Sequence, residues 1–218
     1  MFEECISLTS IHIPANIEVF GGAFGGCENL TSISVDEENP YYCSDETGCI
    51  YNKDKTKLVA CSPVITKLEL PDTVTELSLG SFYKCRKLES FEIPENVKVI
   101  GDEYSKNIFA GCINLKDLSV SENNTKYSSD KYGNIYNKAK TQLLQGAPGA
   151  ENVIVPKSVE KIWDNVFCEC QNLKSITLSE GIKKLGNYAF QGCCSLKQIS
   201  IPASLTEIGY GTFGGCER

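Results

Sequence analysis

The sequence is poor in the residues that usually carry acid–base chemistry. Its 218 residues include a single His, a single Met and a single Trp, so no relay between two histidines can form. Neither a G-x-S-x-G motif nor a glycine-rich phosphate loop is present. His12 stands between Ile11 and Ile13, where it is expected to be a solvated strand residue. We therefore expect a protein that is not an enzyme and binds no cofactor.

Positive charge and long hydrophobic runs are also lacking. The 21 lysines and arginines face 28 acidic residues, a net charge of −7, which disfavours nucleic acid as a partner. No run of 18 apolar residues occurs, and the opening MFEECISLTS has neither a basic nor an apolar export region. The chain as given is expected to contain no transmembrane segment and no signal peptide.

Cysteine, in contrast, is abundant, and its spacing reveals a repeat. An F-x-x-C motif, in most copies extended to F-x-x-C-x-x-L, recurs along the chain and accounts for seven of the 9 Phe and seven of the 12 Cys. The copies are Phe2/Cys5, Phe24/Cys27, Phe82/Cys85, Phe109/Cys112, Phe167/Cys170, Phe190/Cys193 and Phe213/Cys216. One such unit cannot bury its own apolar face, so neighbouring units are expected to stack into a solenoid.

Within a unit, alternating apolar residues predict a short half-buried strand of the form I-x-I, often followed by proline. A second pair of the form V-x-x-I comes next, as in Val97 and Ile100. The glycines before the next motif (Gly21, Gly101, Gly186 and Gly209) are expected to adopt positive φ in a tight reversal. The cleanest units span 23 residues, from Cys170 to Cys193 and on to Cys216.

Two units are longer, at 58 residues each, and they are copies of one another. Cys27 and Cys112 are 85 residues apart, and so are the tyrosine-rich segments that begin at Tyr42 and Tyr127. Polar residues between Ile50-Tyr51 and Leu58-Val59 predict a β-hairpin. Inserted hairpin segments are therefore expected at about 36–67 and 121–152.

The cysteines leave three alternatives open. Most are expected to be buried or incidental free thiols, since buried Cys behaves as a small hydrophobe. One or two disulfides are the second possibility, and a metal site is the least favoured, because no C-x-x-C pair exists and one His is available.

These motifs closely resemble the BspA-like leucine-rich repeats, a 23-residue class that is also found in treponemal surface proteins. The resemblance implies a mainly β or α/β repeat solenoid with a parallel concave sheet, short helical turns at A-F-x-x-C and two inserted hairpins. The recurring Phe and Cys of successive coils are then expected to stack into internal columns. It covers residues 1–218 as one domain, which opens and closes within a repeat and could associate end to end. It further implies a cell-surface or secreted adhesin whose partners are proteins, host or matrix proteins among them.

Binding is expected on the concave strand face, at the outward residues of the I-x-I strands and their flanks. The candidates are His12, Ser34, Glu69, Glu92, Lys116, Ser119, Thr177 and Ser200. The hairpin tyrosines form a competing surface: Tyr42, Tyr51, Tyr127, Tyr132 and Tyr136. A structural spacer of a larger surface protein and an intracellular scaffold or regulator are the alternative functions.

Overall fold

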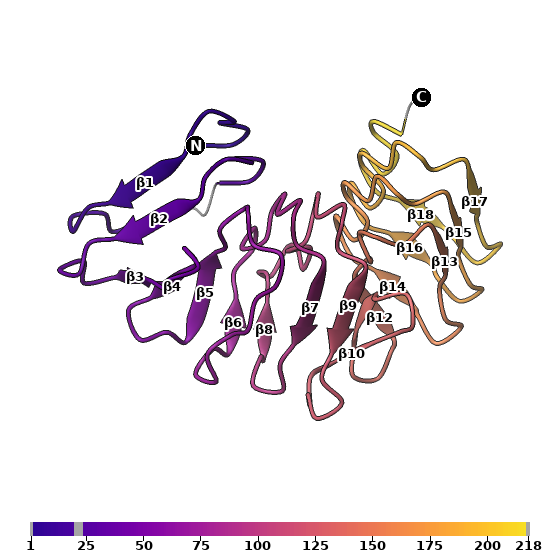
Figure 1. Ribbon diagram of the computed structural model, residues 1–218. Helices are drawn as coiled ribbons and strands as arrows, with labels where there is room; N and C mark the ends of the chain where they lie inside the picture. The colour runs from indigo at the N-terminus through magenta and orange to yellow at the C-terminus, as the bar shows by residue number, and fades with distance from the viewer. Residues whose placement is uncertain (1, 20–23, 217–218) are drawn as a thin grey trace.

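A computed structural model describes residues 2–19 and 24–216 of the chain. The repeats stack into a β-solenoid of about eight turns, and Figure 1 shows them fanned into an arch. In this view the F-x-x-C turns lie along the inner edge of the arch and the proline-containing turns along its outer edge. The I-x-I strands therefore form a broad side of the arch rather than its inner edge.

The I-x-I strands form where the alternating pattern predicts them, and they pair in parallel, as the resemblance implies. We call them the first sheet. They are paired in three separate sections, not in one continuous sheet as expected. The sections contain β1 (Ser10–Ile13) with β2 (Ser32–Val35), β7 (Ser90–Ile93) with β9 (Asp117–Val120), and β13 (Asn152–Ile154) with β15 (Ser175–Thr177) and β17 (Gln198–Ser200).

The V-x-x-I segments form further parallel strands that the sequence pattern did not predict. They are paired in two separate sections, which we together call the second sheet. Each predicted hairpin is part of a three-stranded antiparallel meander whose last strand continues this second sheet. The first group is β3 (Tyr42–Ser44), β4 (Ile50–Asn52), β5 (Lys57–Ala60), β6 (Glu76–Leu77) and β8 (Val99–Ile100). The second is β10 (Tyr127–Ser129), β11 (Ile135–Asn137), β12 (Gln142–Gln145), β14 (Lys161–Ile162), β16 (Lys184–Leu185) and β18 (Glu207–Ile208).

The meanders interrupt the first sheet. After β2, the hydroxyl of Ser44 accepts a hydrogen bond from the Val35 amide at 3.0 Å. In a continuous sheet, a carbonyl of the next strand would accept this bond. The same contact joins Ser129 to the Val120 amide at 3.1 Å after β9. The β3–β4 turn also packs beside β2, since a Cβ on Gly48 would lie 3.3 Å from the Cβ of Ile33. A one-to-one strand ladder cannot continue past these turns.

The expected helical turns at A-F-x-x-C are absent from the residues described, which contain no helix. The motif instead makes consecutive reverse turns, with the Cys85 amide bonded to the Phe82 carbonyl and the Leu88 amide to the Cys85 carbonyl. The residue before the cysteine has positive φ in every copy, as at Lys84 (51°) and Glu169 (62°). A left-handed residue there stops right-handed helix propagation.

The predicted glycine geometry is confirmed at Gly101, with φ of 65°, and is wrong at Gly186 and Gly209, which have no positive φ. Close packing instead explains why glycine stands at these two positions. A Cβ on Gly186, for example, would lie 2.5 Å from the Asp164 amide nitrogen in the preceding coil. Gly21, with Phe20, lies outside the described residues.

Phenylalanine and cysteine form internal columns, as predicted. Ring centroids of Phe190 lie 5.2 Å from Phe167 and 5.6 Å from Phe213, with nearly parallel planes. Each thiol that follows a short unit donates to the phenylalanine carbonyl one coil earlier, as Cys112 does to Phe82 at 2.9 Å. The cysteine column thus combines apolar packing with a second hydrogen bond to a carbonyl that already accepts the amide of its own turn.

Two buried asparagines support the meanders. Asn39 and Asn124 are fully buried and 85 residues apart. The Asn124 amide donates to the carbonyls of Pro94 and Val97, and its oxygen accepts the amides of Lys126 and Tyr127. Each asparagine therefore ties the start of a meander to the preceding proline turn.

Candidate protein-binding face

The outward residues of the first sheet form one surface, which we call the first-sheet face. Strand alternation places apolar residues inside, as Phe91 and Ile93 of β7 show, and leaves Glu92 exposed between them. All eight candidate residues are exposed, and most stand in β-ladder register with one another. The register pairs are His12 with Ser34, Glu92 with Ser119, and Thr177 with Ser200.

At the N-terminal section, His12 contacts two neighbours. Its Nδ1 lies 3.0 Å from Ser34 Oγ, and its Nε2 lies 3.7 Å from a carboxylate oxygen of Asp36. The ring is more than half exposed. These two contacts orient the imidazole on the surface.

The hollows described on the first-sheet face lie in its middle section. Three adjoining hollows of about 330, 550 and 350 Å³ share Glu92 as a lining residue. Their lining includes six carboxylates and two lysines: Glu69, Asp72, Glu92, Glu95, Asp117, Glu122, Lys67 and Lys138. The charged groups at the centre of the face are therefore mainly carboxylates, and they lie beside the half-buried apolar residues Leu68 and Leu70.

Glu69 lines two of these hollows, and Lys116 precedes Asp117, which lines one of them. Glu69 is exposed in a segment that is not a regular strand. This segment is still bonded to the next coil, because the Thr66 carbonyl accepts a hydrogen bond from the Glu89 amide at 3.0 Å. Lys116 precedes β9, and its own amide donates to the Glu89 carbonyl at 3.0 Å. Backbone bonds between coils thus hold both side chains at the surface.

The C-terminal section is less charged. Ile154, Thr177 and Ser200 are in register, and Ile154 is 60% exposed. Lys174 pairs with Glu151 across the coils at 2.8 Å. The charge of the first-sheet face is therefore concentrated in its middle section.

The prediction of a competing tyrosine surface is wrong for Tyr51 and Tyr136, which are fully buried. Their hydroxyls donate to the carboxylates of Asp45 and Asp130, at 3.0 and 2.8 Å. Burial raises the pKa of both phenols well above their ordinary value. Tyr42, Tyr127 and Tyr132 are half-buried. The repeated Asp-to-Tyr spacing in both copies was the signal in the sequence for this buried pair.

The cysteines are all free thiols in the structure, seven of them buried. Burial raises the pKa of Cys112 to about 12 and that of Cys168 to about 11, which disfavours the thiolate that metals and oxidants require. Among the described residues, no group of three or more Cys, His, Asp or Glu is placed to hold a metal ion. The same part of the chain contains no helix that could cross a membrane.

Comparison with known proteins agrees with this architecture. The family model described as BspA type leucine rich repeat region matches residues 1–138 and 141–218. The chain belongs to the BspA-type leucine-rich repeat family. Among curated proteins, no match to the sequence is found.

Solved structures similar to this BspA-type chain include three bacterial proteins. The pneumococcal vaccine antigen PcpA is 22% identical, with a TM-score of 0.60, over 96% of this chain and 49% of the antigen. A leucine-rich repeat protein from Eubacterium ventriosum is 27% identical, with a TM-score of 0.56, over 96% and 59%. A leucine-rich cell surface protein from Faecalibacterium prausnitzii is 19% identical, with a TM-score of 0.56, over 96% and 65%. The BspA-type chain thus spans about half to two thirds of these structures.

Proposed function

We propose that this BspA-type solenoid is a non-enzymatic protein-binding module of a cell-surface or secreted adhesin, and that it binds through the first-sheet face. Register across coils within each section displays neighbouring side chains on one surface, which is how solenoids hold protein partners. The observation that carries the proposal is that three adjoining hollows share Glu92 as a lining residue. Likeness to a protein named as a cell surface protein supports the location.

The acidic middle section sets the chemistry of the partner. Glu69 and Glu92 line the same two hollows, with Asp72 and Glu95 in one and Asp117 in the other. Complementary charge steers encounter and selects partners. A partner segment rich in lysine or arginine is therefore expected to dock along this section.

The test is a triple charge reversal, Glu69→Lys with Glu92→Lys and Lys116→Glu. Binding is measured by surface plasmon resonance against a panel of purified extracellular matrix proteins. We expect affinity for a bound matrix protein to fall tenfold or more, about 1.4 kcal/mol, with no change in the urea midpoint of unfolding.

The matched control changes the first meander without touching its core. Deleting the meanders is unsuitable, because Tyr51 and Leu58 are fully buried and β5 belongs to the second sheet. Tyr41→Ser with Glu46→Lys alters exposed residues only. Loss of binding in this control with full binding by the triple reversal would place the site on the meander and contradict the proposal.

A further inference from the structure

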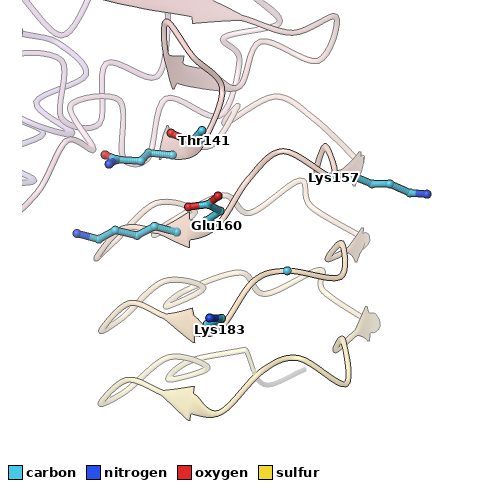
Figure 2. A pocket seen from close by; sticks show the side chains of 7 residues that line it. Thr141, Lys157, Glu160 and Lys183 are labelled. Carbon is cyan, nitrogen blue, oxygen red and sulfur yellow. The ribbon is translucent and has the colours of Figure 1, made fainter.

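A further hollow, of about 630 Å³, lies away from the first-sheet face, along the second sheet of the C-terminal half. It is lined by Thr141, Gln142, Lys157, Glu160, Lys161, Gly181 and Lys183. Figure 2 shows Thr141, Glu160 and Lys183 on successive coils, one below another, while Lys157 extends away from them from the neighbouring turn. The surface over Gly181 is open, because a Cβ there would meet only the Lys157 carbonyl, at 4.0 Å.

The hollow is basic in a protein whose net charge is −7. Three lysines and one glutamate line it, a local charge of +2. Within the part of the chain that the structure describes, Lys157, Lys161 and Lys183 form no ion pair, whereas neighbouring Lys184 pairs with Glu207 at 2.5 Å. The Lys161 ammonium lies 3.8 Å from the ring centroid of Trp163, which places it beside the hollow by a cation–π contact.

The duplicated block provides an internal reference for this charge. Lys157 and Lys161 correspond, 85 residues earlier, to Asp72 and Glu76. Glu76 there forms an ion pair with Lys57, at the position that Gln142 occupies in the second copy. The equivalent residues of the first copy therefore sum to zero, from Lys57 and Lys98 against Asp72 and Glu76. The two copies have the same backbone pattern, so the basic character belongs to the second copy and not to the fold.

Neutral polar groups accompany the lysines. Gln142 Oε1 accepts the Trp163 indole N–H at 3.1 Å, which leaves the side-chain amide hydrogens of Gln142 as donors toward the hollow. Thr141 Oγ1 accepts from Asn137 at 2.9 Å and keeps its own hydrogen to donate. Glu160 supplies a carboxylate acceptor between the cations.

From this combination we infer that the hollow binds an extended anionic polysaccharide, with its sulfate or carboxylate groups at the lysines and its hydroxyls at Glu160, Gln142 and Thr141. A lysine is a flexible point charge suited to such groups. The cations are spread over successive coils instead of converging on one point, which fits a chain-like ligand and not a single small ion. This site is separate from the first-sheet face and does not depend on the proposed protein binding.

The first experiment measures binding of dextran sulfate by isothermal titration calorimetry, with neutral dextran and linear polyphosphate as comparison probes. We expect binding of dextran sulfate that weakens between low and moderate salt, as screened charges do, and no binding of neutral dextran. The variant Lys157→Asp with Lys161→Glu, which installs the first-copy residues, is expected to weaken binding at least tenfold. A control of equal charge change, Lys126→Glu with Lys197→Glu at exposed positions, is expected to weaken it less than threefold.

The second experiment builds the site in the other copy. Asp72→Lys with Glu76→Lys is expected to raise the stoichiometry from one to two bound segments per protein, with thermal unfolding used to confirm that each variant is folded. If the hollow variant and the control of equal charge change lost the same affinity for dextran sulfate, net charge alone would explain the binding and the inference would be overturned. Tighter binding of polyphosphate than of dextran sulfate would also overturn it, because the ligand would then not be a carbohydrate.

Discussion

The thiol of Cys193 donates to the backbone carbonyl of Phe167, 3.0 Å away in the preceding coil. The same bond joins Cys112 to Phe82 and Cys216 to Phe190. Where a meander replaces the preceding F-x-x-C turn, the acceptor changes, and Cys85 lies 3.9 Å from the Ser62 carbonyl. The repeated cysteine is thus both a small core residue and a link between coils.

This arrangement predicts slow modification of the column thiols. Burial raises the pKa of Cys112 and Cys193 above the ordinary thiol value, and the thiolate is the reactive species. With a maleimide reagent at pH 8, we expect exposed Cys5 to react first and the seven buried thiols to react only after unfolding in guanidinium. Mass spectrometry of tryptic peptides checks the order. Cys5→Ser serves as the control and should remove the fastest-reacting fraction.

The unfolded sample also tests disulfides. If fewer than half of the cysteines become labelled after unfolding without reductant, the free-thiol assignment is contradicted and disulfides account for the remainder.

A second prediction is that two adjacent asparagines contribute very differently to the free energy of unfolding. Asn124→Ala removes four hydrogen bonds at a fully buried site and is expected to lower the free energy of unfolding by on the order of 3 kcal/mol. Asn123 is exposed, so Asn123→Ala is expected to change it by less than about 0.5 kcal/mol. Urea denaturation followed by circular dichroism measures both. Similar values for the two variants would show that Asn124 does not anchor the meander.

A third prediction concerns acid and the first coil. Lys84 bonds Glu3 at 2.7 Å and Glu4 at 2.9 Å, and these contacts lower the pKa of both carboxyls below the ordinary value of 4.5. Because the folded-state pKa is lower than the unfolded one, the stabilisation is present above about pH 4.5 and is lost as pH falls through the folded values.

Hydrogen–deuterium exchange of residues 2–13 checks this effect. Protection factors are expected to fall between pH 6 and pH 3 in the native protein. In the Lys84→Met variant they should already be low at pH 6 and change less with acid. An equal pH dependence in both proteins would assign the acid response to other groups.

Much of the repeat was predictable because its signals are local. Alternation of apolar and polar residues predicts the first-sheet strands and their outward side, as in Phe91, Glu92 and Ile93. The 85-residue offset predicts two equivalent meanders, and the recurring Phe and Cys predict the internal columns. The outward direction of the candidate binding residues follows from the same alternation, whereas their role in binding is a proposal.

Other features depend on contacts between coils, which patterns within a single repeat do not predict. The positive φ that prevents a helical turn occurs at Lys84 and Glu169, which are not glycines. Four other copies have glycine in this position, namely Gly26, Gly111, Gly192 and Gly215, so the sequence contained a signal for this turn that was not used. Tyr51 and Tyr136 have the composition of a binding surface, yet they are buried because the meander folds back onto the second sheet. Gly186 is required by a neighbouring coil 23 residues away. Periodicity along the chain was thus sufficient for the repeat unit and its inward face, while contacts between coils decided the interrupted first sheet, the second sheet and the basic hollow, because each is made by residues that meet only when the coils stack.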